Sequence, residues 1–550
     1  MRNNIASEQS LENSIVAWLR AIASWNSLRA LPIWLGLAVL VGGFYLLLAA
    51  QGYGVAGFPL DDAWIHQTYA RNLATTGQWA FVAGQTSAGS TSPLWSLLLS
   101  LGYWLGVPYQ VWTYGLGMVA LGLTGWSVAR LGGRLFPDRP WVGPLGGFLC
   151  VMEWHLTWAS VSGMETILYT WLSVLVVDLW LLADRRDLPG SSPVLGGAIR
   201  AASHWWGLGL VGGLLVLTRP EGLGLVGLIG LAAGWRLRHM PGRLLRTWAA
   251  IGIGLALPLI PYLVFHYLTT GLPFPNTFYA KQEEYRLLLS LYPLWRRWLM
   301  VAAVTLVGGQ VLLLPGFAYA IWRSSSRLRS PVPGLWPSIY GPLLCAVWWF
   351  IHLTLYGLRL PVTYQHGRYQ MPVIPFFILI GLGGTTYLLR PRARMLLLRV
   401  LSRASVAATF LLFLVFLALG ARAYATDVAF IQGEMVAVAR WLAANVPPES
   451  LIAVHDIGAI GYFTPRPLLD LAGLVTPEVI PFITDEVGLI EFMQARGADY
   501  VVFFPDWSDA YRRMAADPRL QPVYATGFEW TLEQGRANMT VYRLQRRHDR

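Results

Sequence analysis

Two adjacent aspartates, Asp61 and Asp62, carry the clearest potential for chemistry in this sequence. They open the stretch PLDDAWIHQTYARNLATTGQWAFVAGQTSAGSTSPLW (residues 59–95), in which apolar and aromatic residues recur every four positions after the doublet, as on one helix face. A carboxylate beside a cavity at a membrane surface can act as a general base on a hydroxyl group. The alternative is structural: Asp61 caps this helix and Asp62 complements its dipole, each contributing at most about 1 kcal/mol. Taken alone, the doublet favours the structural interpretation.

A lone lysine supplies a second candidate. Lys281 is the only lysine among 41 basic residues and lies in GLPFPNTFYAKQEEY (residues 271–285), two positions after Tyr279. An ammonium group beside aromatic rings can hold a phosphate at the level of the lipid headgroups. A lysine that reaches the interface from an aromatic belt, without any ligand, explains the same pattern. The sequence supports both interpretations equally.

An arginine between two ring side chains forms a third candidate. In YQHGRYQMPVIP (residues 364–375), Arg368 lies between His366 and Tyr369 at the start of an apolar run. Guanidinium groups bind phosphates through two parallel hydrogen bonds. We therefore expect this motif to bind an anion at a membrane interface.

Two further motifs place charges between apolar runs. GMET (residues 163–166) puts Glu165 at the start of one run, and TRPEG (residues 218–222) puts Arg219 and Glu221 between two others. We expect Arg219 and Glu221 to neutralise each other.

The composition indicates which elements must position these residues. Hydrophobic residues make up 55% of the 550 positions, charged residues only 13%, and the mean hydropathy is +0.48. Soluble domains carry about 25% charged residues, and runs of about 20 apolar residues cross the ~30 Å hydrocarbon core of a bilayer. The chain is therefore predicted to be a polytopic membrane protein. Its apolar segments lie near residues 31–51, 92–107, 110–129, 141–160, 165–183, 196–217, 222–235, 247–268, 298–322, 336–357, 371–389 and 404–421.

The charge distribution predicts the topology. Residues 1–426 carry a formal charge of +17 and residues 427–550 carry −5. Arginine holds cytoplasmic loops in place, so the positive charge belongs to loops that flank the membrane, and nucleic acid is excluded as a partner. The connectors between the arginine-rich loops, and everything after residue 421, are then extracytoplasmic. A cytoplasmic N-terminus and an external tail require an odd number of crossings, so one of the twelve segments, with 92–107 as the candidate, is re-entrant or wrongly divided. The arginine-rich loops are 184–190, 236–246, 323–329 and 390–403.

The pattern changes after residue 421. A helical stretch at 432–446 and a helix near 489–496 alternate with short strand-like runs, which predicts a small extracytoplasmic α/β domain. The predicted strands lie near 451–454, 468–471, 500–504, 522–527 and 539–544. In this domain His455, Asp456 and Asp470 either bind an acceptor or only stabilise the fold.

Several function classes are excluded or weakened. Cys150 and Cys345 both lie in apolar runs, so neither a disulfide framework nor a cysteine metal cluster is available. No Walker A loop occurs, which excludes an ATP-driven pump. Ionisable residues within the runs could relay ions, although Glu153 and His155 are two positions apart and would not share a helix face. The relay candidates are Glu153, His155, Asp178 and His204.

Taken together, these blocks resemble the GT-C superfamily, integral-membrane glycosyltransferases that use polyprenyl-phosphate-linked sugars. The match is close to the bacterial branch related to the mycobacterial terminal arabinofuranosyltransferase. It rests on an ordered series of blocks over roughly residues 30–505: DDAWIHQTYARNLA, TSPLW, GMET, RPEG, PNTFYAK, HGRY, HDIGAIGYF and LLDLAGL.

The resemblance implies a catalytic role for the aspartate doublet. Asp61 would be the general base, Asp62 would support it, and Glu165 would be a second carboxylate of the cavity. The resemblance also implies contacts to the donor phosphate and a few further candidates. The implied donor contacts are Lys281, Arg368, Tyr279 and His366, and the further candidates are Arg71, Arg219 and Glu221.

The resulting prediction is an all-α membrane domain of the GT-C type with about 11–13 transmembrane helices, followed by a small α/β domain. The expected boundaries are a cytoplasmic segment at 1–30, a membrane domain at 31–425 with its first external loop at 52–91, and an extracytoplasmic domain at 426–550. The expected location is the plasma or inner membrane.

The predicted function is inverting transfer of a sugar from a polyprenyl-phosphate donor to the hydroxyl of a glycan, lipid or protein acceptor. No ligand spacing identifies a metal site, so use of a divalent metal stays open. The rival interpretations are a transporter or flippase of lipid-linked sugars and, below it, a non-catalytic scaffold that binds glycans.

Overall fold

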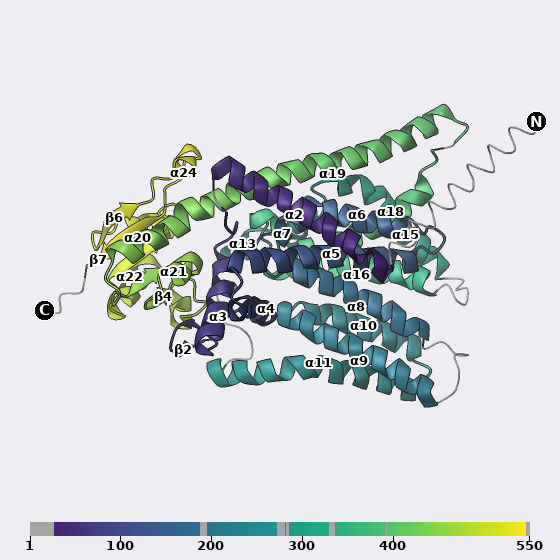
Figure 1. Cartoon of the computed structure of the whole chain (residues 1–550), viewed down its shortest axis with the longest axis horizontal. Helices are drawn as coiled ribbons and strands as arrows, with labels where there is room; N and C mark the ends of the chain where they lie inside the picture. Colours follow the sequence, from purple (N-terminus) through teal and green to yellow (C-terminus); the bar gives the residue numbers. More distant parts are fainter. Residues whose placement is uncertain are drawn as a thin grey trace, which may run out of the picture.

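The computed structural model describes residues 27–54, 56–87, 89–186, 195–271, 281, 285–328, 336–391, 393–483 and 485–545. A bundle of helices forms its larger part, and a small α/β region lies at one end of the bundle (Figure 1). Helix α19 (Leu396–Ile431) runs along the bundle and continues through the π-helical turn Gln432–Val436 into α20 (Ala437–Asn445). A continuous helical segment therefore joins the two parts.

Six of the described helical segments are long and apolar enough to cross a membrane, and a seventh is a pair of helices bent by 108°. The six are built on α2 (Leu31–Tyr53), α8 (Thr166–Arg186), α11 (Pro241–Thr270), α16 (Trp336–Arg359), α17 with α18 (Tyr364–Gly367 and Ile374–Leu388) and α19, and the bent pair is α14 (Leu294–Val304) with α15 (Leu314–Arg327). Shorter or less apolar helices complete the bundle. They are α5 (Tyr109–Leu135), α6 (Val142–Met152), α7 (Trp154–Ser160), α9 (Leu195–Thr218) and α10 (Gly222–Leu237).

The segment predicted at 92–107 is helix α4 (Pro93–Trp104), which has 12 residues. Such a helix is about 18 Å long, too short for the ~30 Å hydrocarbon core. This length agrees with the expectation that the segment is re-entrant, and the topology expected from the charges would place the two ends of the chain on opposite sides of the membrane. The beginning of α2 and the C-terminal sheet indeed lie at opposite ends of the molecule (Figure 1).

Three of the predicted relay groups in the bundle, Glu153, His155 and Asp178, have structural partners. The helix breaks at Glu153, which caps α7 by accepting a hydrogen bond from the Leu156 amide at 2.9 Å, and the break brings its carboxylate within 2.6 Å of His155 Nδ1. The expectation that these two side chains would diverge is therefore wrong, because it assumed an unbroken helix. Asp178 on α8 forms ion pairs with Arg130 and Arg134.

The α/β region contains a five-stranded sheet of order β4-β3-β5-β7-β6. Strand β3 pairs in parallel with β4 and β5, and β7 pairs antiparallel with β5 and β6. The strands are β3 (Ile452–Val454), β4 (Leu468–Asp470), β5 (Tyr500–Phe503), β6 (Leu520–Ala525) and β7 (Thr540–Leu544). All five predicted strands and the predicted helix α22 (Glu486–Ala495) are present. Three short helices that the sequence pattern did not reveal are α21 (Ile457–Phe463), α23 (Asp509–Ala515) and α24 (Glu529–Glu533).

Helix α3 (Asp62–Thr76) lies where the bundle meets the α/β region (Figure 1). It packs against α4 on one side and α21 on the other. The ring of Trp64 lies 5.0 Å from that of Tyr462 and 4.8 Å from that of Phe463, both on α21. This aromatic contact fixes the beginning of α3, and with it the two aspartates, between the two parts of the molecule.

Candidate active site

The two adjacent aspartates at the start of α3 have entirely different partners. Asp61 does not cap its own helix through its side chain. Its carboxylate oxygens instead accept hydrogen bonds from the backbone amides of Gly458, at 2.7 Å, and Ala459, at 2.8 Å. These amides are free donors at the start of α21, so Asp61 ties the membrane bundle to the α/β region.

The surroundings of Asp61 favour its protonated form more than those of an ordinary aspartate. The side chain is buried. Burial and the nearby Asp456 carboxylate raise the pKa of Asp61 to about 7, although its two amide partners act to lower it. A carboxylate with this pKa titrates near neutral pH, where general bases are most effective.

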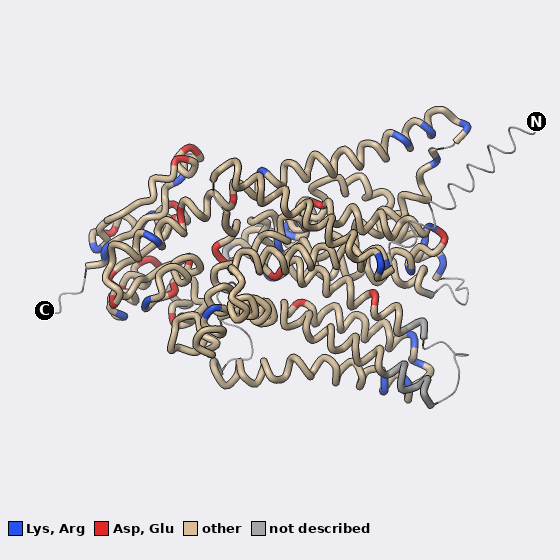
Figure 2. The backbone as a smooth tube through the Cα atoms, in the orientation of Figure 1, with Lys and Arg blue, Asp and Glu red and all other residues tan. Residues whose placement is uncertain are grey.

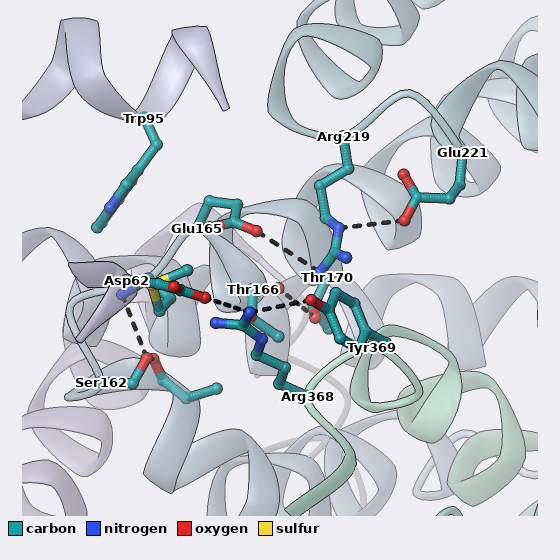
Figure 3. A network of polar contacts seen from close by, with 12 residues as sticks. Asp62, Trp95, Ser162, Glu165, Thr166, Thr170, Arg219, Glu221, Arg368 and Tyr369 are labelled. Carbon is teal, nitrogen blue, oxygen red and sulfur yellow. Dashed lines mark hydrogen bonds and ion pairs between the residues drawn. The ribbon is translucent and has the colours of Figure 1, made fainter. Parts of the chain in front are cut away.

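Asp62 faces a cluster of cations rather than the backbone amides that bind Asp61. It forms an ion pair with Arg368 and its side chain is 37% exposed. Burial acts to raise the pKa of Asp62, but Arg368 and Lys281 outweigh it and lower that pKa. Asp62 is therefore held as an anion beside Arg368 (Figure 3).

The hydroxyl group of Tyr369 is the meeting point of this cluster. It accepts hydrogen bonds from Lys281 Nζ at 2.6 Å and from Arg368 Nη2 at 2.9 Å. The guanidinium carbon of Arg219 lies 4.7 Å from the centroid of its ring. Three cations therefore surround one aromatic side chain.

Arg219 connects this cluster to two glutamates. Its guanidinium group lies 3.5 Å from the Glu165 carboxylate and 3.2 Å from the Glu221 carboxylate, between the two (Figure 3). It also donates to the Tyr356 hydroxyl at 3.0 Å. Burial acts to raise the pKa of Glu165, but the neighbouring His66 and the charge of Arg219 lower it to about 2. The expected pairing of Arg219 with Glu221 is present, but Arg219 links both glutamates.

The cluster contains buried hydrogen-bond donors that have no acceptor among the described residues. Arg368 is only 4% exposed, and its Nε and Nη1 atoms have no hydrogen-bond partner among the described residues. Buried donors of this kind are rare in proteins unless a ligand or water completes them. An anion next to Arg368 and Lys281 would satisfy these donors with charge-assisted hydrogen bonds.

Two other predicted site residues have their hydrogen bonds outside this network, and a third lies outside the described residues. The hydrogen bond of His366 goes to Asp427 on α19, and that of Arg71 goes to the Tyr462 carbonyl oxygen at 2.7 Å. Tyr279 lies outside the described residues. The structure thus brings together the side chains of Asp62, Glu165, Arg219, Glu221, Lys281 and Arg368.

Two members of the network, His66 and Tyr356, were not singled out from the sequence, and Tyr369 was named there only as a neighbour of Arg368. His66 lies 3.6 Å from Glu165 and binds the Ser96 hydroxyl at 3.0 Å. Its position four residues after Asp62, on the same helix face, was an available signal. Tyr356 and Tyr369 gave no such signal, because aromatic residues are frequent at membrane interfaces.

Within the described part of the chain, no group of three or more His, Cys, Asp or Glu residues could hold a metal ion. The acidic side chains of the network are instead paired with arginine.

Known protein sequences match parts of the chain. Residues 423–542 match the family described as Domain of unknown function (DUF8728). The terminal β-(1→2)-arabinofuranosyltransferase of Mycobacterium tuberculosis is 28% identical over 237 residues, which is 40% of this chain and 34% of that protein. The chain thus aligns with about a third of the length of this curated relative.

Solved structures resemble the chain over nearly its whole length. ArnT from Cupriavidus metallidurans, solved with undecaprenyl phosphate, has a TM-score of 0.55 at 15% identity, covering 94% of this chain and 98% of ArnT. The oligosaccharyltransferase of Archaeoglobus fulgidus has a TM-score of 0.57 at 14% identity, covering 90% of this chain and 72% of the archaeal protein. These likenesses confirm the predicted GT-C fold.

Proposed function

We propose that this protein transfers a sugar from a polyprenyl-phosphate donor to a hydroxyl group of an acceptor outside the cytoplasm. The observation that carries the proposal is Arg368, a buried arginine with two unused donor atoms, next to Lys281 and paired with Asp62. The GT-C fold and the undecaprenyl phosphate bound by ArnT support the choice of a lipid-phosphate donor.

The cations would bind and stabilise the donor phosphate. As the bond from the sugar to the phosphate breaks, negative charge accumulates on the departing lipid phosphate. Arg368 and Lys281 lie 2.9 and 2.6 Å from one tyrosine oxygen, so both can reach a single anion placed beside it. Preorganised cations that stabilise a developing charge are usually the largest source of rate acceleration.

Asp61 is the proposed general base, and Asp62 the residue that holds Arg368. A base must gain a proton during the reaction, which favours the carboxylate whose pKa is raised to about 7 over its neighbour, whose pKa Arg368 and Lys281 lower. Each carboxylate oxygen can accept more than one hydrogen bond, so the Asp61 oxygens keep lone pairs beyond those used by Gly458 and Ala459. Attack from the side opposite the phosphate would invert the anomeric centre.

Purified protein in detergent, supplied with a panel of polyprenyl-phosphate sugars and candidate acceptors, would test the proposal. Mass spectrometry would measure released polyprenyl phosphate for the wild type, Asp61→Asn and Asp62→Asn. We expect release by the wild type and a loss of at least about 100-fold in Asp61→Asn, the size of a general-base contribution. Full activity in Asp61→Asn together with loss in Asp62→Asn would transfer the base role to Asp62. No release from any donor by folded wild-type protein would refute the function itself.

The transporter alternative receives no specific support from the described structure. A transporter of charged substrates needs ionisable groups near the middle of the membrane. Two of the groups predicted for that role, Glu153 and Asp178, are a helix cap and the partner of two arginines.

A further inference from the structure

The segment that leads to Arg368 has an unusual backbone. Gln365, His366 and Gly367 have φ angles of 54°, 56° and 67°, three consecutive residues in the left-handed region. Glycine adopts this conformation freely, but a side chain with a Cβ atom clashes with the backbone there. Among the described residues, Gln365 and His366 are the only residues other than glycine with positive φ. Strain of this kind persists only where surrounding contacts enforce it, and it concentrates at functional sites.

The contacts that enforce this conformation come from α19 and α7. His366 Nε2 lies 2.8 Å from Asp427 Oδ2 on α19, and the same oxygen accepts a hydrogen bond from the Trp158 indole at 2.9 Å. The His366 ring lies edge-on against two indole rings, at 5.4 Å from Trp154 and 5.3 Å from Trp158. One carboxylate and two tryptophans thus hold one histidine.

The third residue of the segment is fixed by close packing. A Cβ atom on Gly367 would lie 2.4 Å from Val304 Cγ1 on α14, so a larger residue would force this side chain to shift. Glycine at position 367 therefore suits both the positive φ angle and the close packing. The next two residues, Arg368 and Tyr369, are those that meet Asp62 and Lys281.

We propose that Asp427 and His366 are positioning residues that act through Arg368. In this arrangement, which rests on the proposed function, Asp427 holds His366 in the left-handed conformation, and the turn through Gly367 then directs the Arg368 guanidinium group to the donor phosphate. Asp427 lies on the helix that continues into the α/β region, so the same contact links the position of that helix to the cation cluster.

The first test compares Asp427→Ala with the matched control Thr426→Val. Thr426 is the preceding residue of α19 and contacts Tyr53, away from the cation cluster. We expect Asp427→Ala to raise the donor KM about tenfold and to lower kcat as well, since a misplaced Arg368 would lose both its grip on the donor phosphate and its stabilisation of the developing charge. Thr426→Val should leave both constants and the melting temperature unchanged. An unaltered donor KM in a folded Asp427→Ala protein would overturn the proposal.

A double mutant separates positioning from general destabilisation. If Asp427 acts only through Arg368, then adding Asp427→Ala to Arg368→Ala should leave the donor KM of the single Arg368→Ala variant unchanged. If adding Asp427→Ala raises the donor KM of Arg368→Ala by the same factor as it raises that of the wild type, the two residues act independently and the proposal is contradicted.

Two substitutions of His366 test the backbone conformation itself. Asparagine tolerates the left-handed region and can bond to Asp427, whereas β-branched valine does neither. We expect His366→Asn to keep a donor KM near that of the wild type and His366→Val to raise it as Asp427→Ala does. The reverse order would refute the role of the turn.

Hydrogen exchange distinguishes failure of this proposal from failure of the proposed function. Faster amide exchange over residues 362–373 in Asp427→Ala than in Thr426→Val would support the positioning contact, even if no polyprenyl-phosphate sugar proved to be a substrate. Identical exchange in the two variants would reject the contact even if the wild type transferred sugar.

Discussion

At the scale of single residues, two identical side chains next to each other in the sequence receive opposite electrostatic environments. Asp61 faces backbone amides and a second carboxylate, and Asp62 faces Arg368. The separation of their pKa values is what allows one to exchange a proton and the other to remain an ion-pair partner. A doublet of aspartates in a sequence cannot reveal this, because the partners of each come from segments 300 to 400 residues away.

The raised pKa of Asp61 predicts a pH dependence. The base must be deprotonated, so kcat/KM should fall about tenfold per pH unit below the pKa of the free enzyme, which is about 7. Asp456→Asn removes a neighbouring negative charge that raises this pKa and should move the acid limb to lower pH. The measurement is donor turnover from pH 5 to pH 9 for both proteins, and coincident profiles would contradict the assignment of Asp61.

The same pKa shift has a consequence for stability. Because the folded protein binds this proton more tightly than the unfolded chain, the contribution of Asp61 to stability is present at low pH. It is lost as pH rises from about 4, the ordinary aspartate value, to about 7. In Asp61→Asn this particular dependence should disappear.

The guanidinium group of Arg368 predicts a graded response to substitution. Arg368→Lys keeps the charge but loses the planar set of donors, and Arg368→Ala loses both. We expect donor KM to rise in the order wild type, Lys, Ala, with the Ala variant losing about 1.5–3 kcal/mol of binding, the value of a charge-assisted hydrogen bond. The matched control is Arg422→Ala, an exposed arginine on α19. A Lys variant indistinguishable from the wild type would show that charge alone suffices.

At the scale of elements, α3 shows which structural features a sequence pattern predicts and which it does not. The period of four predicted its helical state and its start at the aspartates, and both are confirmed. The pattern implied a single buried face, whereas residues 63–70 are buried all round. The reason is that α3 lies between α4 and α21, and α21 is one of the short helices that the sequence did not reveal.

The contact between α3 and α21 predicts a strong effect of one small substitution. A Cβ atom on Gly458 would lie 2.0 Å from the Asp61 carbonyl oxygen and 2.6 Å from its Oδ2 atom. Gly458→Ala should therefore separate α21 from Asp61, lower the free energy of unfolding by about 1–3 kcal/mol and reduce donor turnover. The control is Gly227→Ala on α10, where nothing lies within 4 Å of the added carbon. Equal stability and turnover in the two variants would show that this contact is dispensable.

At the scale of the whole molecule, apolar runs and charge balance were sufficient to predict the architecture. Each predicted run coincides with a helix or a broken pair of helices, and the strands of the tail lie where the short apolar runs placed them. Arginines gather at the helix ends far from the sheet, and acidic residues are frequent around the sheet (Figure 2). These features follow from local composition. The joining of the two parts does not, because it depends on side chains that meet only in the folded chain.

Glu434 is one of these joining side chains, and it supports the last prediction. It is fully buried in the π-helical turn between α19 and α20. Its carboxylate accepts hydrogen bonds from Thr526, from Thr531, from the Asn538 amide group at 2.8 Å and from the Met539 backbone amide at 3.0 Å. A single carboxylate thus holds the segment between β6 and β7 onto the helix that leaves the membrane bundle.

Removing this carboxylate should loosen the α/β region while the bundle stays intact. Glu434→Ala leaves several buried donors unsatisfied, each costing about 1–3 kcal/mol, whereas Glu529→Ala removes an exposed carboxylate nearby and should cost little. We expect faster hydrogen exchange over residues 526–539 in Glu434→Ala only, with exchange in α5 and α8 unchanged. If donor turnover falls together with this local loosening, the α/β region must be docked for the Asp61 site to work. Turnover equal to that of Glu529→Ala, despite the faster exchange, would show that the membrane bundle carries the reaction without it.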